Sequence, residues 1–426
     1  AMPWPLEEKI IRGFSEDLEE ILVVEEKRPV MESQIKEQLY NWPSDSRPRI
    51  VGKFDEQGAS IFPYTGELNP TQIARAIAKR IHGSSQTEAV NRKIEESLNF
   101  LDKKDLSSEK NSINIERIPY FCSGCPHNIS TEVPSGSRAA AGIGCHYMSI
   151  WMDRNTETFT QMGGEGANWL GQAPFTTTDH IFVNIGDGTY FHSGILAIRA
   201  AVAANVNVTY KILYNDAVAM TGGQSMDGPL DVSSITWQVR AEGVNQISVV
   251  SDYPDKYPQD TNFAPNVTFH HRDDLDAVQR KLRDNKGVSV LVYDQTCAAE
   301  LRRRRKRGIN LDPLKRPFIN AAVCEGCGDC GIQSNCVSIA PLETELGRKR
   351  TINQSSCNKD FSCINGFCPA FVTVHDSQPR KSVGISKASF DALPNPKLAD
   401  CSEPFSILVT GIGGTGVVTV GAILSM

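Results

Sequence analysis

A glycine-flanked aspartate and a later asparagine mark the first place where this sequence could do chemistry. Gly186-Asp187-Gly188 follows one apolar, strand-like run, and Asn215 ends the next such run. Neighbouring parallel strands end at the same edge of a sheet, where phosphate-bearing ligands commonly bind. The Asp187 carboxylate, the Asn215 amide oxygen and the backbone carbonyl of Ala217 are hard oxygen ligands of the kind that Mg²⁺ prefers. Because the flanking glycines let the backbone approach phosphates, the sequence predicts a diphosphate bound through Mg²⁺ at this edge.

A cysteine-rich block, residues 324–368, contains seven of the twelve cysteines. The chain begins without a secretion signal, so we expect metal or cluster ligation rather than disulfides. The spacing C-x2-C-x2-C is typical of bacterial ferredoxins, whose fourth cysteine ligates the other cluster. This crossover predicts a 4Fe–4S cluster on Cys324, Cys327, Cys330 and Cys368. A second cluster begins with Cys336, Cys357 and Cys363. Zinc is the alternative occupant of the block.

The second half of the block has an aspartate where a ferredoxin would carry its middle cysteine. Residues 357–363 read C-x2-D-x2-C, which places Asp360 at that position. A carboxylate oxygen is a harder donor than a thiolate and holds the iron of a soft sulfide cluster less firmly. If Asp360 is the fourth ligand, the second cluster should lose one iron and tend toward 3Fe–4S. The alternative is that Asp360 is a solvated loop residue.

Longer stretches around these residues resemble a known enzyme family. They are Cys122-Ser-Gly-Cys125-Pro-His127, Gly142-Ile-Gly-Cys145, Met162-Gly-Gly-Glu-Gly-Ala-Asn-Trp169, the run GDGTYFHSG with His192, and Thr221-Gly222-Gly223-Gln224. They are similar to the 2-oxoacid:ferredoxin oxidoreductases, specifically to the indolepyruvate branch, and the cysteine-rich block fits the fused bacterial form. The resemblance implies thiamine diphosphate as the diphosphate ligand, an aryl-pyruvate substrate, Fe–S clusters, coenzyme A, and ferredoxin as electron acceptor.

The resemblance also implies roles for single residues. His127 and His192 are expected to face the cofactor's thiazolium ring or the substrate as catalytic residues. Glu165, charged within a glycine-rich run, is expected to contact the cofactor or its pocket. Met220 stands where pyruvate-specific relatives tend to carry an amide, which favours an apolar, aromatic substrate.

A third set of cysteines lies in the same region as the predicted cofactor site. Cys122, Cys125 and Cys145 suit an iron–sulfur site, which needs four ligands. Cys297 occupies the place where relatives carry a fourth cysteine, so a 4Fe–4S cluster is expected on these thiols. The alternative is a structural or zinc-binding pair, Cys122 and Cys125, with Cys297 as a buried thiol.

Strand-like and helix-like segments must position these residues. Between residues 118 and 300 apolar strand runs alternate with helical runs, which indicates a parallel sheet with crossover helices. We predict a multidomain α/β chain with a doubly wound, thiamine-diphosphate-binding sheet, a transketolase C-terminal-like domain and a ferredoxin-like Fe–S segment. The boundaries are 1–82 for the transketolase C-terminal-like domain, 83–116 for a helical or flexible linker, 117–300 for the thiamine-binding domain, 301–317 for a basic linker, 318–375 for the Fe–S segment, 376–404 for a linker, and 405–426 for the start of a Rossmann-like gamma-type domain.

Two further segments have open interpretations. The basic run 302–307 is either a solvated linker or a docking surface for an acidic redox partner. The run Gly411-x-Gly413-x-x-Gly416 matches a dinucleotide fingerprint, but the ribose-binding acid expected some 20 residues later is absent from the printed sequence. We therefore interpret it as the opening of the Rossmann-like module rather than as an NAD or FAD site.

Composition bounds the class of protein. The 426 residues carry a net charge of −6, with 40% hydrophobic and 22% charged residues, the ordinary balance of a globular protein. A nucleic-acid partner is not expected. No apolar run is long enough for a membrane span, so we expect a cytoplasmic protein, and a homo-oligomer.

The function predicted is thiamine-dependent oxidative decarboxylation of an aryl 2-oxoacid to acyl-CoA, with electrons passed through two to three clusters to ferredoxin. Family members take the glutamate that activates thiamine from a further domain. We expect that domain outside residues 1–426, so that the chain would act with the remaining domains of the same enzyme. The alternatives are a non-oxidative thiamine enzyme with structural zinc and a pure electron-transfer module.

Overall fold

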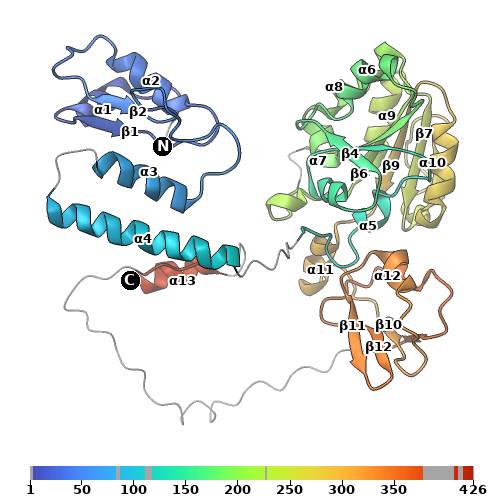
Figure 1. Ribbon diagram of the computed structural model, residues 1–426. Helices are drawn as coiled ribbons and strands as arrows, with labels where there is room; N and C mark the ends of the chain where they lie inside the picture. Colours follow the sequence, from blue (N-terminus) through green and yellow to red (C-terminus); the bar gives the residue numbers. More distant parts are fainter. Residues whose placement is uncertain are drawn as a thin grey trace. The chain divides into compact units, whose positions relative to one another are not determined.

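The computed structural model describes residues 3–82, 87–110, 118–225, 228–377, 407–410 and 416–425. The chain divides into two compact units, Ala1–Arg117 and Ile118–Met426, which Figure 1 colours blue to cyan and green to red. We describe each unit by itself. In the described residues no helix is long and apolar enough to cross a membrane.

The first unit is a small α/β arrangement. Strands β1 (Glu20–Leu22) and β2 (Arg49–Val51) pair in parallel, and their apolar side chains pack on helix α2 (Val30–Leu39). Helix α1 (Glu8–Ser15) precedes β1, and α3 (Pro70–His82) follows β2. The segment predicted as a helical or flexible linker contains α4 (Glu88–Lys110), which packs against α3. Arg75 of α3 forms ion pairs there with Asp102 and Asp105 of α4.

A parallel sheet of seven strands forms the centre of the second unit, within its described residues. In spatial order the strands are β4 (Thr156–Phe159), β3 (Ala139–Ala141), β5 (Ile181–Gly186), β6 (Val208–Tyr214), β9 (Val288–Asp294), β7 (Gln246–Ser251) and β8 (Thr268–His271). The central strands are buried along almost their whole length, as near-continuous apolar runs of parallel sheets require. The α/β fold with a parallel sheet is thus confirmed.

Helices cover both faces of this sheet (Figure 1). One face packs on α6 (Ala167–Gln172), α8 (Ile195–Ala204) and α9 (Val232–Ala241), through residues such as Trp169 and Ile235. The other face packs on α10 (Leu275–Arg283) through Leu275 and Leu282. Short helical turns connect the elements: α5 (His127–Ser130), η1 (Cys145–Trp151), η2 (Ala173–Phe175), α7 (Asp187–Thr189), η3 (Tyr190–Gly194), η4 (Ala219–Thr221), η5 (Pro254–Lys256) and η6 (Arg272–Asp274).

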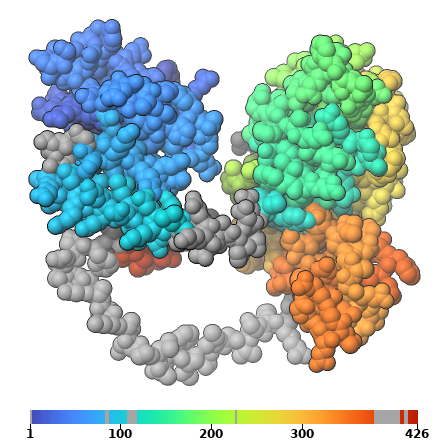
Figure 2. Space-filling model, in the orientation of Figure 1, coloured from blue at the N-terminus to red at the C-terminus, as the bar shows by residue number. Residues whose placement is uncertain are grey.

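The cysteine-rich segment closes on itself between two paired strands. β10 (Arg316–Ile319) and β13 (Phe371–Val374) are antiparallel neighbours, although most of the segment separates them along the chain. Between them lie α12 (Asp329–Ser334), the hairpin of β11 (Ile339–Thr344) and β12 (Gly347–Ile352), and the turn η7 (Ser362–Ile364). In Figure 2 this orange segment lies directly against the sheet domain.

The basic run 302–307 is not the linker that we predicted. Helix α11 (Ala298–Lys306) includes most of it, and its arginines have internal acceptors. Arg302 donates to the carbonyls of Ser355 and Ser356, and Arg305 donates to the carbonyl of Asn358. Arg302 and Arg305 therefore bind the helix to the cysteine-rich segment, and the basic run is not fully solvated.

At the end of the chain the structure describes residues 407–410 and helix α13 (Val417–Leu424). Gly411 and Gly413 of the glycine fingerprint, and most of the predicted linker 376–404, lie outside the described residues.

Candidate functional site

Loops that follow the carboxyl ends of β3, β5 and β6 surround a cavity of about 460 Å³. The residues predicted to bind the Mg²⁺–diphosphate, Gly186, Asp187, Gly188, Asn215 and Ala217, all line it. β5 and β6 pair in register up to Gly186 and Leu213, so the two strands end side by side. The structure thus brings together at one sheet edge the residues that the sequence singled out.

The Asp187 carboxylate is fixed by backbone amides. Oδ1 accepts a hydrogen bond from Gly188 N at 2.8 Å, and Oδ2 accepts from Asn215 N at 2.8 Å and Asp216 N at 3.0 Å. Burial raises the pKa of Asp187 to about 6, against the opposing effect of these amides. A cation beside the carboxylate would favour its charged form, so this site suits a bound divalent ion.

The Asn215 side chain supplies a second oxygen. Asn215 is 8% exposed, and its Oδ1 is buried without a hydrogen-bond partner among the described residues. A buried polar oxygen without a partner is costly unless a ligand satisfies it. Ala217, 3% exposed, places its backbone in the same turn. These donors fit Mg²⁺, which takes few protein ligands together with phosphate oxygens.

Both histidines predicted to be catalytic line the cavity, in different environments. His127 is buried, and this burial lowers its pKa to about 4, so that the ring is neutral near pH 7. His192 is exposed at the cavity wall, where its Nδ1 lies 2.6 Å from Ser193 Oγ. It belongs to η3, a π-helical turn that directly follows α7, the short helix that begins at Asp187. Turns of this kind are frequent at functional sites.

The sequence analysis missed His146, which also lines the cavity. Its ring lies edge-on to His127, with ring centroids 5.6 Å apart, and burial lowers its pKa to about 3. Its Nε2 has no partner among the described residues. The glycines before His146 were the only indication in the sequence that the backbone packs tightly there. A Cβ on Gly142 would lie 2.7 Å from His146 Nε2 and 2.4 Å from the Asn184 carbonyl oxygen.

Glu165 was predicted to contact the cofactor or its pocket, but it is not among the residues that line this cavity. The residue is fully buried, and its carboxylate accepts from the backbone amides of Gly163 at 2.7 Å and Ile143 at 3.5 Å. Burial raises its pKa, and His192 opposes that rise. Glu165 therefore joins the loop after β3 to the loop before α6.

Most of the remaining cavity wall is apolar. Its described residues include Met162, Phe191, Val218 and Met220. Met220 is 66% exposed at the opening. A wall of this composition suits a substrate with a large apolar group.

Of the four cysteines predicted to hold a cluster near the cofactor site, Cys145 lines the cavity. Burial, together with the Cys297 and Cys122 thiols, raises the pKa of Cys145 to about 11. Cys125 is buried with a raised pKa, to which Cys122, Cys297 and Cys145 all contribute. Cys145 lines the cavity, and Cys297 N donates to the Asn215 carbonyl at 2.9 Å. The thiol group and the predicted cofactor site therefore share a wall.

Within the cysteine-rich block, thiols of the same predicted group raise one another's pKa in two cases. Burial raises the pKa of Cys330, as do Cys368, Cys324 and Cys327 nearby. Burial raises the pKa of Cys363 to about 12, with further contributions from Cys336, Cys357 and Asp360. Among the described residues no three or more Cys, His, Asp or Glu side chains form a group that could hold a metal ion. Cluster ligation by these groups therefore stays a prediction.

Asp360 is not the solvated loop residue of the alternative interpretation. Its side chain is 10% exposed, and Oδ1 accepts from Arg272 Nη1 at 2.5 Å and Gln295 Nε2 at 2.9 Å. Oδ2 accepts from Ser362 N at 3.3 Å. Oδ1 of this carboxylate therefore binds side chains of the sheet domain, whereas Oδ2 accepts only one long hydrogen bond within the described residues.

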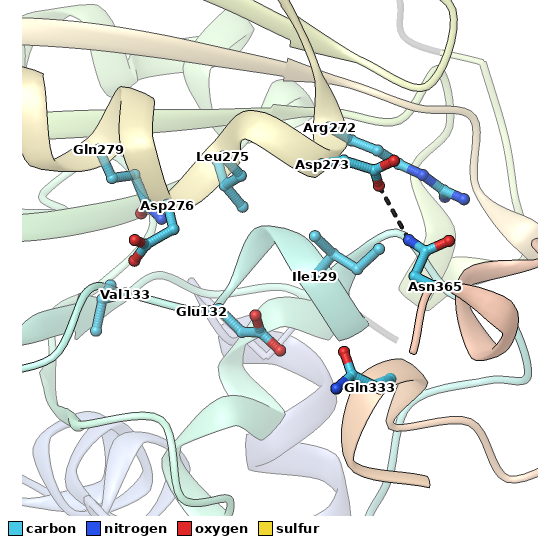
Figure 3. Close-up of a pocket in the computed structure, with 10 residues that line it drawn as sticks. All are labelled: Ile129, Glu132, Val133, Arg272, Asp273, Leu275, Asp276, Gln279, Gln333 and Asn365. Carbon is cyan, nitrogen blue, oxygen red and sulfur yellow. Dashed lines mark hydrogen bonds between the residues drawn. The ribbon is translucent and has the colours of Figure 1, made fainter. Parts of the chain in front are cut away.

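The contact between the sheet domain and the cysteine-rich segment extends beyond Asp360. Figure 3 shows Asp273 of η6 accepting a hydrogen bond from Asn365, with Gln333 of α12 across the same cavity. Behind the cysteine motif, a Cβ on Gly124 would meet Asp360 Cβ at 2.8 Å, and the φ of Gly124 is +62°. Only a glycine permits this close approach.

Two models of known protein families match separate parts of the chain. Residues 142–292 match the family model of the thiamine pyrophosphate enzyme C-terminal TPP-binding domain, and residues 1–63 match the indolepyruvate ferredoxin oxidoreductase middle domain. The first of these matches includes Asp187, Asn215 and Ala217, so this part of the chain resembles a thiamine-diphosphate-binding domain.

Curated relatives are similar to a larger part of the chain than the family models match. The chain is 26% identical over 366 residues to indolepyruvate oxidoreductase subunit IorA of Thermococcus kodakarensis, covering 79% of the chain and 50% of the relative. It is 25% identical over 387 residues to the same subunit of Archaeoglobus fulgidus, covering 86% and 53%. The chain spans about half the length of these relatives. The chain is therefore similar to this indolepyruvate oxidoreductase subunit over most of its own length.

Solved structures also match part of the chain. A 2-oxoglutarate:ferredoxin oxidoreductase from Magnetococcus marinus aligns with a TM-score of 0.32 and 20% identity, over 42% of this chain and 65% of that one. A benzoylformate decarboxylase from Polynucleobacter necessarius aligns with a TM-score of 0.29 and 16% identity, over 40% and 32%.

Proposed function

We propose that this chain takes part in the oxidative decarboxylation of an aryl 2-oxoacid of the indolepyruvate type, in the cytoplasm. The product is an acyl-CoA, and electrons leave through iron–sulfur clusters to ferredoxin. The observation that carries the proposal is the shared wall of two sites. Cys145 lines the cavity that contains Asp187, and Cys297 is hydrogen-bonded to Asn215.

Asp187, Asn215 and the Ala217 carbonyl would hold Mg²⁺ and through it the diphosphate of thiamine diphosphate. When bound, this cofactor supplies the electron sink that loss of CO₂ from a 2-oxoacid requires. Asp187 contributes the charge, and its three amide hydrogen bonds hold its carboxylate in place. Asn215 contributes a neutral oxygen that lacks another partner among the described residues.

The histidines and the apolar wall would orient the substrate. His127 and His146 are neutral near pH 7, because burial lowers the pKa of each. They can therefore exchange hydrogen bonds without placing a charge beside the apolar wall. His192, exposed at the wall and close to Ser193, is available to move a proton. Met220 and Phe191 favour an aromatic substrate over a small one.

Cys122, Cys125, Cys145 and Cys297 would hold a cluster next to this cavity. A cluster there can accept electrons one at a time, so that two successive transfers complete a two-electron oxidation. The groups at Cys330 and Cys363 would continue the path. A non-oxidative enzyme has no need for thiols at this wall.

The test is anaerobic reconstitution of the chain with iron and sulfide. We expect acid-labile sulfide in stoichiometric amount with iron, and a smaller content of both in Cys297→Ala. The variant Cys327→Ala serves as a control, because it should lose a different cluster signal in electron paramagnetic resonance. Zinc bound without sulfide would contradict the proposal and favour structural zinc.

A further inference from the structure

A basic cavity lies between α11 and the turn that follows β12. Its volume is about 310 Å³, and Cys357 and Asn358 contribute to its wall. The described residues that line it include five cationic side chains and one carboxylate. The cations are Arg302, Arg305, Lys306, Arg316 and Lys359, and the carboxylate is Asp312.

The charge of these cations is poorly compensated. Asp312 pairs with both Lys359 and, at 3.5 Å, Arg316, so one negative charge serves two positive ones. Arg302 and Arg305 donate to backbone carbonyls, which carry no charge. No ion pair of Lys306 occurs among the described residues. The cavity therefore has a strongly positive potential.

Buried polar atoms of residues that line the cavity have no hydrogen-bond partner in the described part of the chain. Arg316 is 6% exposed, and its Nε is buried without such a partner among the described residues. The same is true of Arg305 Nε and, as an acceptor, of Gln354 Oε1. Burying a charged donor without a partner is costly, so an anion in this cavity would remove the cost.

We propose that this cavity binds the phosphate group of a small metabolite. A phosphate accepts several hydrogen bonds from planar guanidinium donors at once. A hydroxyl on the same ligand can donate to Gln354 Oε1. A volume of 310 Å³ is at the small end of the range for metabolite sites. Arg316, which lines the cavity, is only 6% exposed, so a ligand small enough to enter the cavity is favoured over an acidic protein.

Calorimetric titration of the full chain with inorganic phosphate tests this proposal. The buffer is free of divalent metal, because the site at Asp187 needs a cation before it can take an anion. Ionic strength is held constant with chloride. We expect one phosphate per chain in the wild-type protein, and protection from hydrogen exchange in peptides that cover residues 354–359.

Three variants and a control locate the site. Arg316→Gln should weaken phosphate binding by about tenfold, the effect of one charged hydrogen bond. Arg302→Gln and Lys306→Gln lie at the exposed rim and should each weaken binding by about threefold. Arg303→Gln is the control on the same helix. Arg303 pairs with Glu300 and is not among the residues that line the cavity, so its loss should leave affinity unchanged.

The rim variants keep the test decisive if Arg316→Gln does not fold. Absence of phosphate binding in the wild-type protein would overturn the proposal. So would equal losses in Arg303→Gln and the rim variants, which would indicate a diffuse, adventitious attraction of anions. None of these results depends on thiamine binding.

Discussion

The ion pair between Arg272 and Asp360 joins the sheet domain to the cysteine-rich segment, and its loss should loosen that segment. Both side chains are 10% exposed, and Arg272 Nη2 also donates to the Asp360 carbonyl at 2.7 Å. Removing one partner of a buried pair leaves an uncompensated buried charge, at a cost of about 3–5 kcal/mol. Arg272→Ala should therefore raise the opening equilibrium of the segment by roughly 10²- to 10⁴-fold, with about 150-fold as the lower limit.

Hydrogen exchange of the full chain measures this opening directly. Amides in residues 354–364 should exchange much faster in Arg272→Ala, while those of the central strands stay protected. The control is Arg280→Ala, whose pair with Asp276 is exposed and should contribute only about 0.3–0.5 kcal/mol. A double variant, Arg272→Ala with Asp360→Ala, should be less destabilised than the sum of the single variants. Unchanged exchange in Arg272→Ala would refute the reasoning.

The other predictions concern cluster ligation, pH dependence and cavity shape. Asp360→Cys should keep four irons under mild oxidation; a 3Fe–4S electron paramagnetic resonance signal equally strong in both proteins would count against ligation by Asp360. Burial lowers the pKa of Lys211 to about 7, so the unfolded chain binds a proton that the folded chain lacks between pH 7 and about 10. The free energy of unfolding should therefore rise with pH in that window, by up to about 1.4 kcal/mol per pH unit. Urea titrations of Lys211→Met should lack this rise, and a rise that persists in the variant would contradict the prediction. Gly142→Ala would force a Cβ to within 2.4 Å of the Asn184 carbonyl oxygen. We expect thermal melts to show a loss of about 1–3 kcal/mol of stability and calorimetry to show weaker thiamine binding. A substitution without effect would show that the loop can move to accommodate the methyl group.

Residues set by local spacing were predictable from the sequence. Asp187, Asn215 and Ala217 follow adjacent parallel strands, and the rule that such strands end together is enough to place them in one cavity. The grouping of Cys336, Cys357 and Cys363 followed from ferredoxin spacing and stays a prediction, although Cys336 and Cys357 both raise the pKa of Cys363.

Residues set by long-range packing were not predictable. The arginines of α11 resembled a solvated run, because their acceptors are carbonyls about 50 residues later in the chain, which no local pattern shows. His146 lies within no charged or metal-binding motif, and glycine contacts determine its burial. The strand β3 is an alanine run of low strand propensity, paired on both sides by tertiary context.

The site at Asp187 is the centre of this account, and calorimetric titration with thiamine diphosphate tests it most directly. The control is Asp216→Asn, since Asp216 is the neighbouring carboxylate, pairs with Arg304, and has a φ of +57° that asparagine tolerates. We predict binding that requires Mg²⁺ in the wild-type protein and in Asp216→Asn, a weaker affinity in Asn215→Ala, and the largest loss in Asp187→Ala. An affinity in Asp187→Ala equal to that of the wild-type protein would contradict the account.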